Sequence, residues 1–185
     1  MLLGNLIKTA SKRYKKIPIK GISFDSRNIK RKDIFFAIKG KKNSGVRFIN
    51  DAIKKGASVI VGDRKVKKKN LKIPFILVKD VRKSLTGACA NLYKEKPKNI
   101  IAVTGTNGKS SVADFFYQIL SFNKVPVASI GTLGIYSKKY TKKTNLTSLD
   151  PLSLHKSLKI LSKKKINNVI LEASSHGLIQ KRLDN

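Results

Sequence analysis

The stretch Thr-Gly-Thr-Asn-Gly-Lys-Ser-Ser, residues 104–111, decides the fold of this chain. It follows a short apolar run at residues 100–103, and apolar residues recur at helical spacing directly after it, over residues 112–120. Glycines allow a turn whose backbone N–H groups point at phosphate oxygens, and the positive end of the following helix lies at the same place. The order of strand, glycine-rich turn, Gly-Lys-Ser and helix therefore predicts a phosphate-binding loop. We expect its strand to be buried on both faces.

The residue types in this loop predict how it binds a nucleotide. The Lys109 ammonium can reach the β- and γ-phosphates, and the Ser110 hydroxyl can ligate Mg²⁺. A glycine-rich turn that only caps a helix is the alternative, and the Gly-Lys-Ser triplet between strand and helix disfavours it. The expected nucleotide-binding residues are Gly105, Thr106, Asn107, Gly108, Lys109, Ser110 and Ser111.

Strand-like and helical patterns alternate along the whole chain, which predicts an α/β fold. Before the loop we expect strands over residues 19–24, 34–38, 58–61 and 75–78, and helices over 48–55 and 81–93. After it we expect strands over residues 125–130 and 169–171, and a helix over 154–161. Pro97 cannot continue a helix, so we place a domain boundary there, with an N-terminal domain at 1–97 and a central domain at 98–185. The second sheet has no closing element, and we expect this chain to be part of a longer protein.

The net charge of +31 is the most extreme feature of the composition. It could indicate a nucleic-acid-binding protein, since clustered cations release counterions from phosphates. The lysines are instead dispersed in ones, twos and threes, and no aromatic residues alternate with a basic run. We interpret them as a solvated surface that helps to attract anionic substrates, with no nucleic acid as partner.

The sequence also bears on location. It has neither the apolar core of a signal peptide nor about 20 consecutive apolar residues, so no membrane insertion is expected. Its single cysteine, Cys89, cannot form an intrachain disulfide, which favours a reducing, cytoplasmic location.

The phosphate loop has the short Gly-x-x-Gly-Lys-Ser form, without the four residues that usually precede the Gly-Lys pair. In this form it resembles the ATP loop of the Mur ligases and of their relatives, the folylpolyglutamate synthetases. The resemblance implies ATP and Mg²⁺ as ligands. Three other segments separate the members of this superfamily, and with them the resemblance covers nearly the whole chain.

The first segment is Phe-Asp-Ser-Arg at residues 24–27, followed by residues 33–40. It resembles the uridine-nucleotide-binding N-terminal domain of Mur ligases that add the third residue, or the following dipeptide, to the muramoyl peptide. Asp and Ser favour a turn at this place, and a strand ending in Asp-Ser-Arg also exposes a hydroxyl and a guanidinium to a uracil or diphosphate. The uridine-nucleotide contacts implied by the resemblance are Phe24, Ser26, Lys41, Lys42 and Asn43.

The second segment, Asn-Leu-Thr-Ser-Leu-Asp-Pro at residues 145–151, resembles the Thr-Thr-Pro segment that holds the muramoyl peptide near ATP. The resemblance implies substrate contacts by Thr147 and Ser148. Ser148 replaces a threonine and keeps a hydroxyl donor, whereas Leu149 replaces a proline. The Asp-Pro pair also fits a helix N-terminus, and both interpretations can hold together.

The third segment, Glu-Ala-Ser-Ser-His-Gly-Leu at residues 172–178, resembles the Mur ligases of the MurE type, which add the third residue. Glu172 follows a strand at the edge where open α/β sheets place their ligands, and a carboxylate suits Mg²⁺. The resemblance implies that Glu172 and Ser110 bind Mg²⁺ and that Lys109 and Glu172 act in catalysis. The muramoyl-dipeptide contacts that it implies here are Ser174, Gln180 and Arg182.

Two histidines remain to be interpreted. We assign His176 a structural role in a tight turn and not that of a general base, and we expect His155 to be solvated on a helix surface.

The resemblance implies a monomeric ATP-dependent amide ligase that acts on UDP-MurNAc-L-Ala-D-Glu and an amino acid through an acyl phosphate. The added residue is meso-diaminopimelate or lysine. In this family a magnesium-binding histidine, a carbamylated lysine and the amino-acid-binding domain lie farther along the chain, so we expect these 185 residues alone not to complete the reaction. The alternatives are a stand-alone nucleotide-binding module and a basic nucleic-acid-binding protein. The ligase for the next step is disfavoured by residues 172–182.

Overall fold

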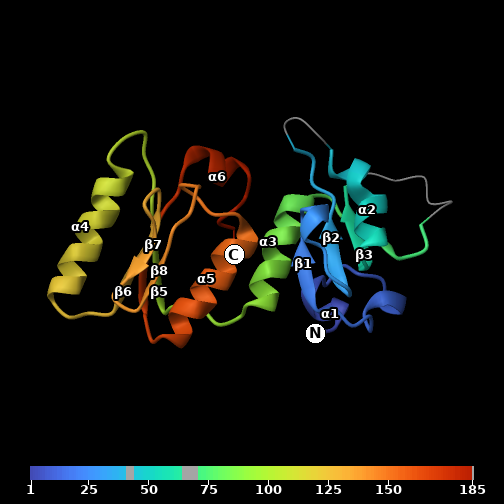
Figure 1. The fold of residues 1–185 in the computed structure, drawn as a ribbon, viewed down its shortest axis with the longest axis horizontal. Helices are drawn as coiled ribbons and strands as arrows, with labels where there is room; N and C mark the ends of the chain where they lie inside the picture. The colour runs from blue at the N-terminus through green and yellow to red at the C-terminus, as the bar shows by residue number, and fades with distance from the viewer. Residues whose placement is uncertain (41–43, 64–70, 185) are drawn as a thin grey trace. The chain divides into compact units, whose positions relative to one another are not determined.

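The computed structural model describes residues 1–40, 44–63 and 71–184. Its chain forms two compact units, Met1–Leu92 and Tyr93–Asn185, and each contains helices and a sheet (Figure 1). The α/β fold class is thereby confirmed. The domain boundary at residue 97 stays a prediction.

The first unit is built on a four-stranded sheet in the order β1-β2-β3-β4, in which all neighbours are parallel. Its strands are β1 Gly21–Ser23, β2 Asp33–Phe36, β3 Ala57–Gly62 and β4 Phe75–Leu77. Its helices are α1 Leu3–Leu6, α2 Ile49–Lys54 and α3 Val81–Leu92, with 3₁₀ turns η1 Lys12–Tyr14, η2 Ser26–Asn28 and η3 Gly45–Phe48. The expected strands and helices of residues 19–93 are thus present, with shorter strands at the N-terminal end.

The core of this unit follows from side-chain alternation in β2. Phe35 and Phe36 are both fully buried, and successive strand residues point to opposite faces, so both faces of the sheet are covered. Phe35 lies in an apolar cluster with Ile49 and Ala52 of α2. Helix α3 buries Leu85 and other apolar residues at helical spacing.

The second unit has a five-stranded sheet in the order β5-β9-β6-β7-β8. Its strands are β5 Asn99–Val103, β6 Val127–Gly131, β7 Gly134–Ser137, β8 Tyr140–Lys142 and β9 Asn168–Glu172. β5, β9 and β6 are parallel, whereas β6, β7 and β8 form an antiparallel meander. Its helices are α4 Lys109–Phe122, α5 Pro151–Lys163 and α6 Ser175–Ile179. α4 and α5 lie on opposite faces of the sheet (Figure 1).

Helix α5 packs its apolar face against the sheet. Leu154, Leu158 and Leu161 are buried in one cluster with residues of β6 and β9. The helix begins as the Asp-Pro pair predicts, because Asp150 accepts a hydrogen bond from the Ser153 backbone N–H at 2.9 Å. No helix in the part of the chain that the structure describes is long and apolar enough to cross a membrane.

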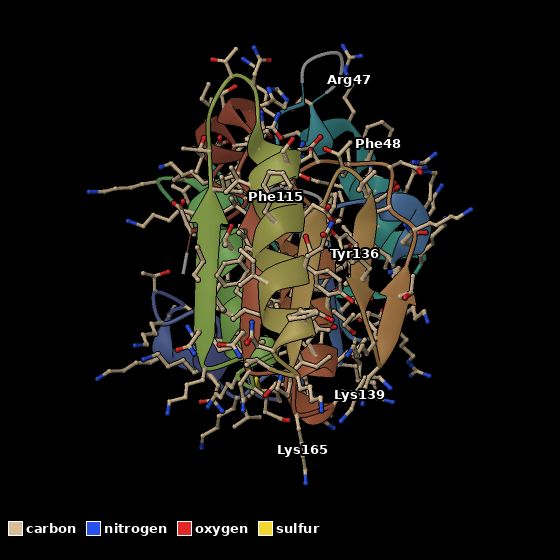
Figure 2. The ribbon with its side chains drawn as sticks, turned by 90° about the vertical axis from the view of Figure 1, so that its left-hand side faces the viewer. Arg47, Phe48, Phe115, Tyr136, Lys139 and Lys165 are labelled. Atoms are coloured by element: carbon tan, nitrogen blue, oxygen red, sulfur yellow. The ribbon has the colours of Figure 1, made fainter. Side chains whose placement is uncertain are left out.

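The β7–β8 meander was not predicted from the sequence, and it is fixed to α4 by aromatic and polar contacts. Tyr136 of β7 meets Tyr117 of α4 edge to face, with ring centroids 4.7 Å apart. Its hydroxyl donates to Asp114 of the same helix at 3.2 Å. Figure 2 shows Tyr136 beside this helix.

Two expectations about burial, those for the strand at residues 100–103 and for His155, are wrong. Strand β5 is not buried on both faces: Ile100 and Ile101 are 37% and 42% exposed, because β5 is the edge strand and pairs only with β9 in the described sheet. The apolar side of α4 is exposed as well, with Phe115 at 62% (Figure 2). His155 is not solvated but buried, at 3% exposure, like Leu154 and Leu158 of the same helix.

The charge composition leads to a prediction about stability. With 41 basic and 10 acidic residues, most cations have no acidic partner to pair with, and mutual repulsion disfavours the compact state. Raising NaCl from about 0.02 to 0.5 M should screen this repulsion and raise the midpoint of thermal unfolding by at least about 3 °C. Circular dichroism melts in NaCl and in KCl should agree. A midpoint that stays constant or falls would contradict the prediction.

Candidate functional site

The loop between β5 and α4 has the geometry of a phosphate-binding loop. Gly108 is the N-cap residue of α4, with φ of 77°, a left-handed conformation that favours glycine. The Lys109 ammonium folds back over the loop and donates to the backbone oxygens of Gly105 at 2.7 Å and Thr106 at 3.2 Å. These acceptors are neutral backbone oxygens. A phosphate oxygen carries charge and forms stronger hydrogen bonds, so it could replace them as the partner of Lys109.

Glu172 ends strand β9 beside this loop and is buried, with 4% of the residue exposed. Ser110 donates to its Oε2 atom from the first turn of α4, at 2.9 Å. Thr132, at the end of β6, donates to Oε1 through its backbone N–H and to Oε2 through its hydroxyl, each at 3.0 Å. The end of β9, the end of β6 and the start of α4 thus converge on one carboxylate, at the edge where parallel sheets bind ligands.

Gly131 makes room for this carboxylate. A Cβ atom at position 131 would overlap Glu172 Oε1 and lie 2.5 Å from Cδ. Beside the carboxylate is a cavity of about 310 Å³. It is lined by Thr106, Asn107, Gly108, Lys109, Ser110, Ser111, Thr132, Thr147, Glu172 and Ser174.

The donor set suits a hard cation. Within the described residues there is no group of three or more His, Cys, Asp or Glu side chains that could hold a metal by themselves. The site offers two oxygen donors, the Glu172 carboxylate and the Ser110 hydroxyl, and the Thr132 hydroxyl donates to that carboxylate. Mg²⁺ prefers oxygen and is usually held by one or two carboxylates together with substrate phosphates and water, so these residues fit Mg²⁺.

The segment that follows β8 is fastened to the end of β9 by Ser148. Its hydroxyl donates to the Glu172 backbone oxygen at 3.0 Å and accepts from the Ser174 N–H at 2.8 Å. Ser148 is 3% exposed, so its hydroxyl faces the protein. Arg182 adds a bond from Nη1 to the Ser148 backbone oxygen at 2.7 Å, and Ser174 caps α6 by accepting from the Gly177 N–H.

The remaining residues of the third segment lie on and after α6. Gln180 Oε1 accepts from Arg182 Nε at 3.1 Å and Nη2 at 2.9 Å. His176 is exposed in the first turn of α6 and contacts the Gln180 side chain. The tight turn that we expected at this histidine is therefore a short helix.

A second cavity, of about 460 Å³, lies in the first unit and is lined by Phe24, Asp25, Ser26, Arg27 and Phe48. Asp25 caps turn η2 by accepting from the Arg27 N–H at 2.9 Å, and it binds the guanidinium through Nε at 3.0 Å and Nη2 at 2.7 Å. This hydrogen bonding lowers the pKa of Asp25. The Asp-Ser-Arg segment thus forms a turn and also lines a cavity.

The sequence identified only part of this cavity. Phe24 and Phe48 are each 38% exposed and offer aromatic surface to a ligand, but no sequence pattern indicated Phe48. Residues 41–43, which include the expected contacts Lys41, Lys42 and Asn43, lie outside the described residues.

Thr132 was also missed, although one signal could have found it. It is the first polar residue after the apolar strand β6, at the edge of the sheet where ligands bind. A phosphate loop that faces a carboxylate at the end of the neighbouring parallel strand is an arrangement by which α/β proteins bind phosphate-bearing ligands.

Comparison with known proteins specifies the family. The family described as Mur ligase middle domain matches residues 103–185, and the one described as Mur ligase family, catalytic domain, matches residues 18–105. The chain belongs to the Mur ligase family.

Its relatives include UDP-N-acetylmuramoyl-L-alanyl-D-glutamate–2,6-diaminopimelate ligases. That of Bradyrhizobium diazoefficiens is 42% identical over 91% of this chain and 34% of its own length. That of Rickettsia montanensis is 45% identical over 89% of this chain and 35% of its own length. The chain thus spans about a third of the length of these relatives. The resemblance to the MurE type is confirmed.

Solved structures agree with this assignment. A structure of a UDP-N-acetylmuramoyl-L-alanyl-D-glutamate–2,6-diaminopimelate ligase matches with a TM-score of 0.84 and 28% identity, over 100% of this chain and 38% of that protein. The MurF ligase of Thermotoga maritima in complex with ADP matches with a TM-score of 0.54 and 25% identity, over 84% of this chain and 32% of that protein.

Proposed function

We propose that this chain forms the ATP- and UDP-MurNAc-dipeptide-binding part of a ligase that adds the third amino acid of the peptidoglycan stem peptide. The observation that carries the proposal is the Glu172 carboxylate, which is held beside the phosphate loop by Ser110. The names of the relatives support UDP-MurNAc-L-Ala-D-Glu and 2,6-diaminopimelate as the substrates.

In the proposed reaction the protein mainly positions phosphates and neutralises their charge. The loop N–H groups and Lys109 bind the phosphates, and Lys109 exchanges its bonds to Gly105 and Thr106 for bonds to the nucleotide. Ser110 and Glu172 would hold Mg²⁺, which would offset the negative charge of the nucleotide phosphates. A substrate carboxylate oxygen attacks the γ-phosphorus, ADP leaves, and the amino group of the incoming residue then displaces phosphate from the acyl phosphate.

For the UDP-MurNAc-dipeptide, we propose one set of binding residues in each unit. The residues proposed to bind or position the muramoyl dipeptide are Thr147, Ser148, Ser174, Gln180 and Arg182. Those proposed to bind the uridine nucleotide are Phe24, Ser26, Lys41, Lys42 and Asn43. The aromatic cavity wall of Phe24 and Phe48 supports stacking of a flat base. We also propose a monomer, and a location in the cytoplasm, which the single cysteine, Cys89, supports.

Titration calorimetry of the 185-residue chain with ATP and Mg²⁺ tests the nucleotide part of this proposal. Lys109→Ala should weaken ATP binding at least about tenfold, because it removes a charge-assisted hydrogen bond to phosphate. The control is Lys139→Ala, which removes the same charge at the opposite end of the unit (Figure 2) and should leave binding unchanged. Equal losses in both variants, or none in Lys109→Ala, would reject the assigned loop.

A further inference from the structure

Thr132 holds both oxygens of the Glu172 carboxylate. Its backbone N–H donates to Oε1 and its hydroxyl to Oε2, each at 3.0 Å. The second of these oxygens also accepts from Ser110 at 2.9 Å. Thr132 therefore holds the carboxylate at two points from the turn directly after β6, whereas Glu172 itself belongs to β9.

These two hydrogen bonds fix the orientation of the Glu172 carboxylate, which the torsions of the side chain alone do not fix. The last torsion of a glutamate is broad, so the direction of its two oxygens depends on their hydrogen-bond partners. Gly131 leaves the space in which Oε1 lies, and the Thr132 N–H fills that oxygen's hydrogen-bonding capacity on the β6 side. As a result Oε2 is directed toward Ser110 and the phosphate loop.

The same hydroxyl reaches the proposed substrate segment. Thr132 Oγ1 lies 3.1 Å from Thr147 Oγ1 and 3.0 Å from Glu172 Oε2. A threonine hydroxyl has a single proton, so it cannot donate fully to both acceptors at once. The strength of the hydrogen bond from Thr132 to Glu172 therefore depends on where the Thr147 hydroxyl lies.

We infer that Thr132 is a positioning residue for the divalent cation that accompanies the nucleotide: it orients Glu172 and links that carboxylate to Thr147. This inference rests on the proposed function. Partners that orient a metal ligand typically contribute about 10- to 100-fold to metal affinity.

The experiment measures Mn²⁺ binding to the 185-residue chain saturated with ATP, by the electron paramagnetic resonance signal of free Mn²⁺. Thr132→Val keeps the shape and the backbone N–H but removes the hydroxyl, and it should weaken Mn²⁺ binding about tenfold. Thr132→Ser restores the hydroxyl and should bind within about threefold of the original chain. The matched control is Thr141→Val, at an exposed threonine of β8, which should change nothing.

ATP affinity in EDTA and a thermal melt separate a cation effect from a structural one. Both should be the same in the original chain and in Thr132→Val. Unchanged Mn²⁺ affinity in Thr132→Val would overturn the inference and leave the proposed function standing, and so would an equal loss of ATP affinity in EDTA. If the original chain binds no ATP even with Mn²⁺, the proposed function fails and the inference fails with it.

Discussion

Gly131→Ala is expected to destabilise the chain by about 3 kcal/mol and to remove cation-dependent nucleotide binding. The added Cβ would overlap Glu172 Oε1, and the backbone at 131 is not left-handed, so the clash with the carboxylate is the main cost. Overpacking of this kind costs about 1–3 kcal/mol, and the lost bonds from Thr132 and Ser110 to a buried charge add to it. Urea denaturation followed by fluorescence or circular dichroism gives the free energy of unfolding.

A double-mutant cycle identifies the cause of this loss. In a Glu172→Ala background the carboxylate is absent, so Gly131→Ala should then cost less than about 1 kcal/mol. The coupling between the two positions should therefore reach at least about 2 kcal/mol. If Gly131→Ala lowered the free energy of unfolding equally in both backgrounds, its cost would not come from a clash with the Glu172 carboxylate.

His155 should make the chain sensitive to mild acid. Burial lowers the pKa of this histidine from 6.5 to about 4, and the positive charge of Lys96 acts in the same direction. Its Nε2 atom has no hydrogen-bond partner among the described residues. Between pH 6.5 and about 4 the unfolded chain therefore binds a proton that the folded chain does not, and stability falls as the pH falls, by up to about 3 kcal/mol. Below about pH 4 the folded chain is protonated too, and this contribution no longer changes.

His155→Leu tests this because leucine has a similar volume and does not titrate. The difference in unfolding free energy between pH 7.5 and about 5 should shrink by about 2 kcal/mol relative to the original chain. His176→Leu, at the exposed histidine of α6, is the matched control and should keep the original difference. A His155→Leu variant as acid-sensitive as the original chain would show that other groups cause the loss.

The sequence predicted the features that depend on local chemistry. A phosphate loop needs particular residues at adjacent positions, so the glycine-rich turn and the helix that follows it could be predicted from the motif and the apolar residues after it. The cap at Asp150 was likewise readable from the Asp-Pro pair. Glu172 could be expected near the loop because the carboxyl ends of parallel strands share an edge.

Features that depend on distant partners were not predictable in the same way. Thr132 reaches Glu172 because β6 lies next to β9 in the sheet. Hydrophobic periodicity predicts strands but does not predict their order in a sheet. His155 is buried although its polar ring suggested a solvated helix surface, because burial depends on what packs over α5 in three dimensions. β7 and β8 are three to four residues long, too short for their alternation to be recognised.

The exposed edge of β5 also affects how the chain behaves in solution. An edge strand with apolar side chains, such as Ile100 and Ile101, is a template for intermolecular sheet pairing, that is, for aggregation. The net charge of +31 keeps molecules apart and so protects this edge. Salt weakens that protection while it strengthens the fold of each molecule. Conformational stability and colloidal stability should therefore respond to ionic strength in opposite directions.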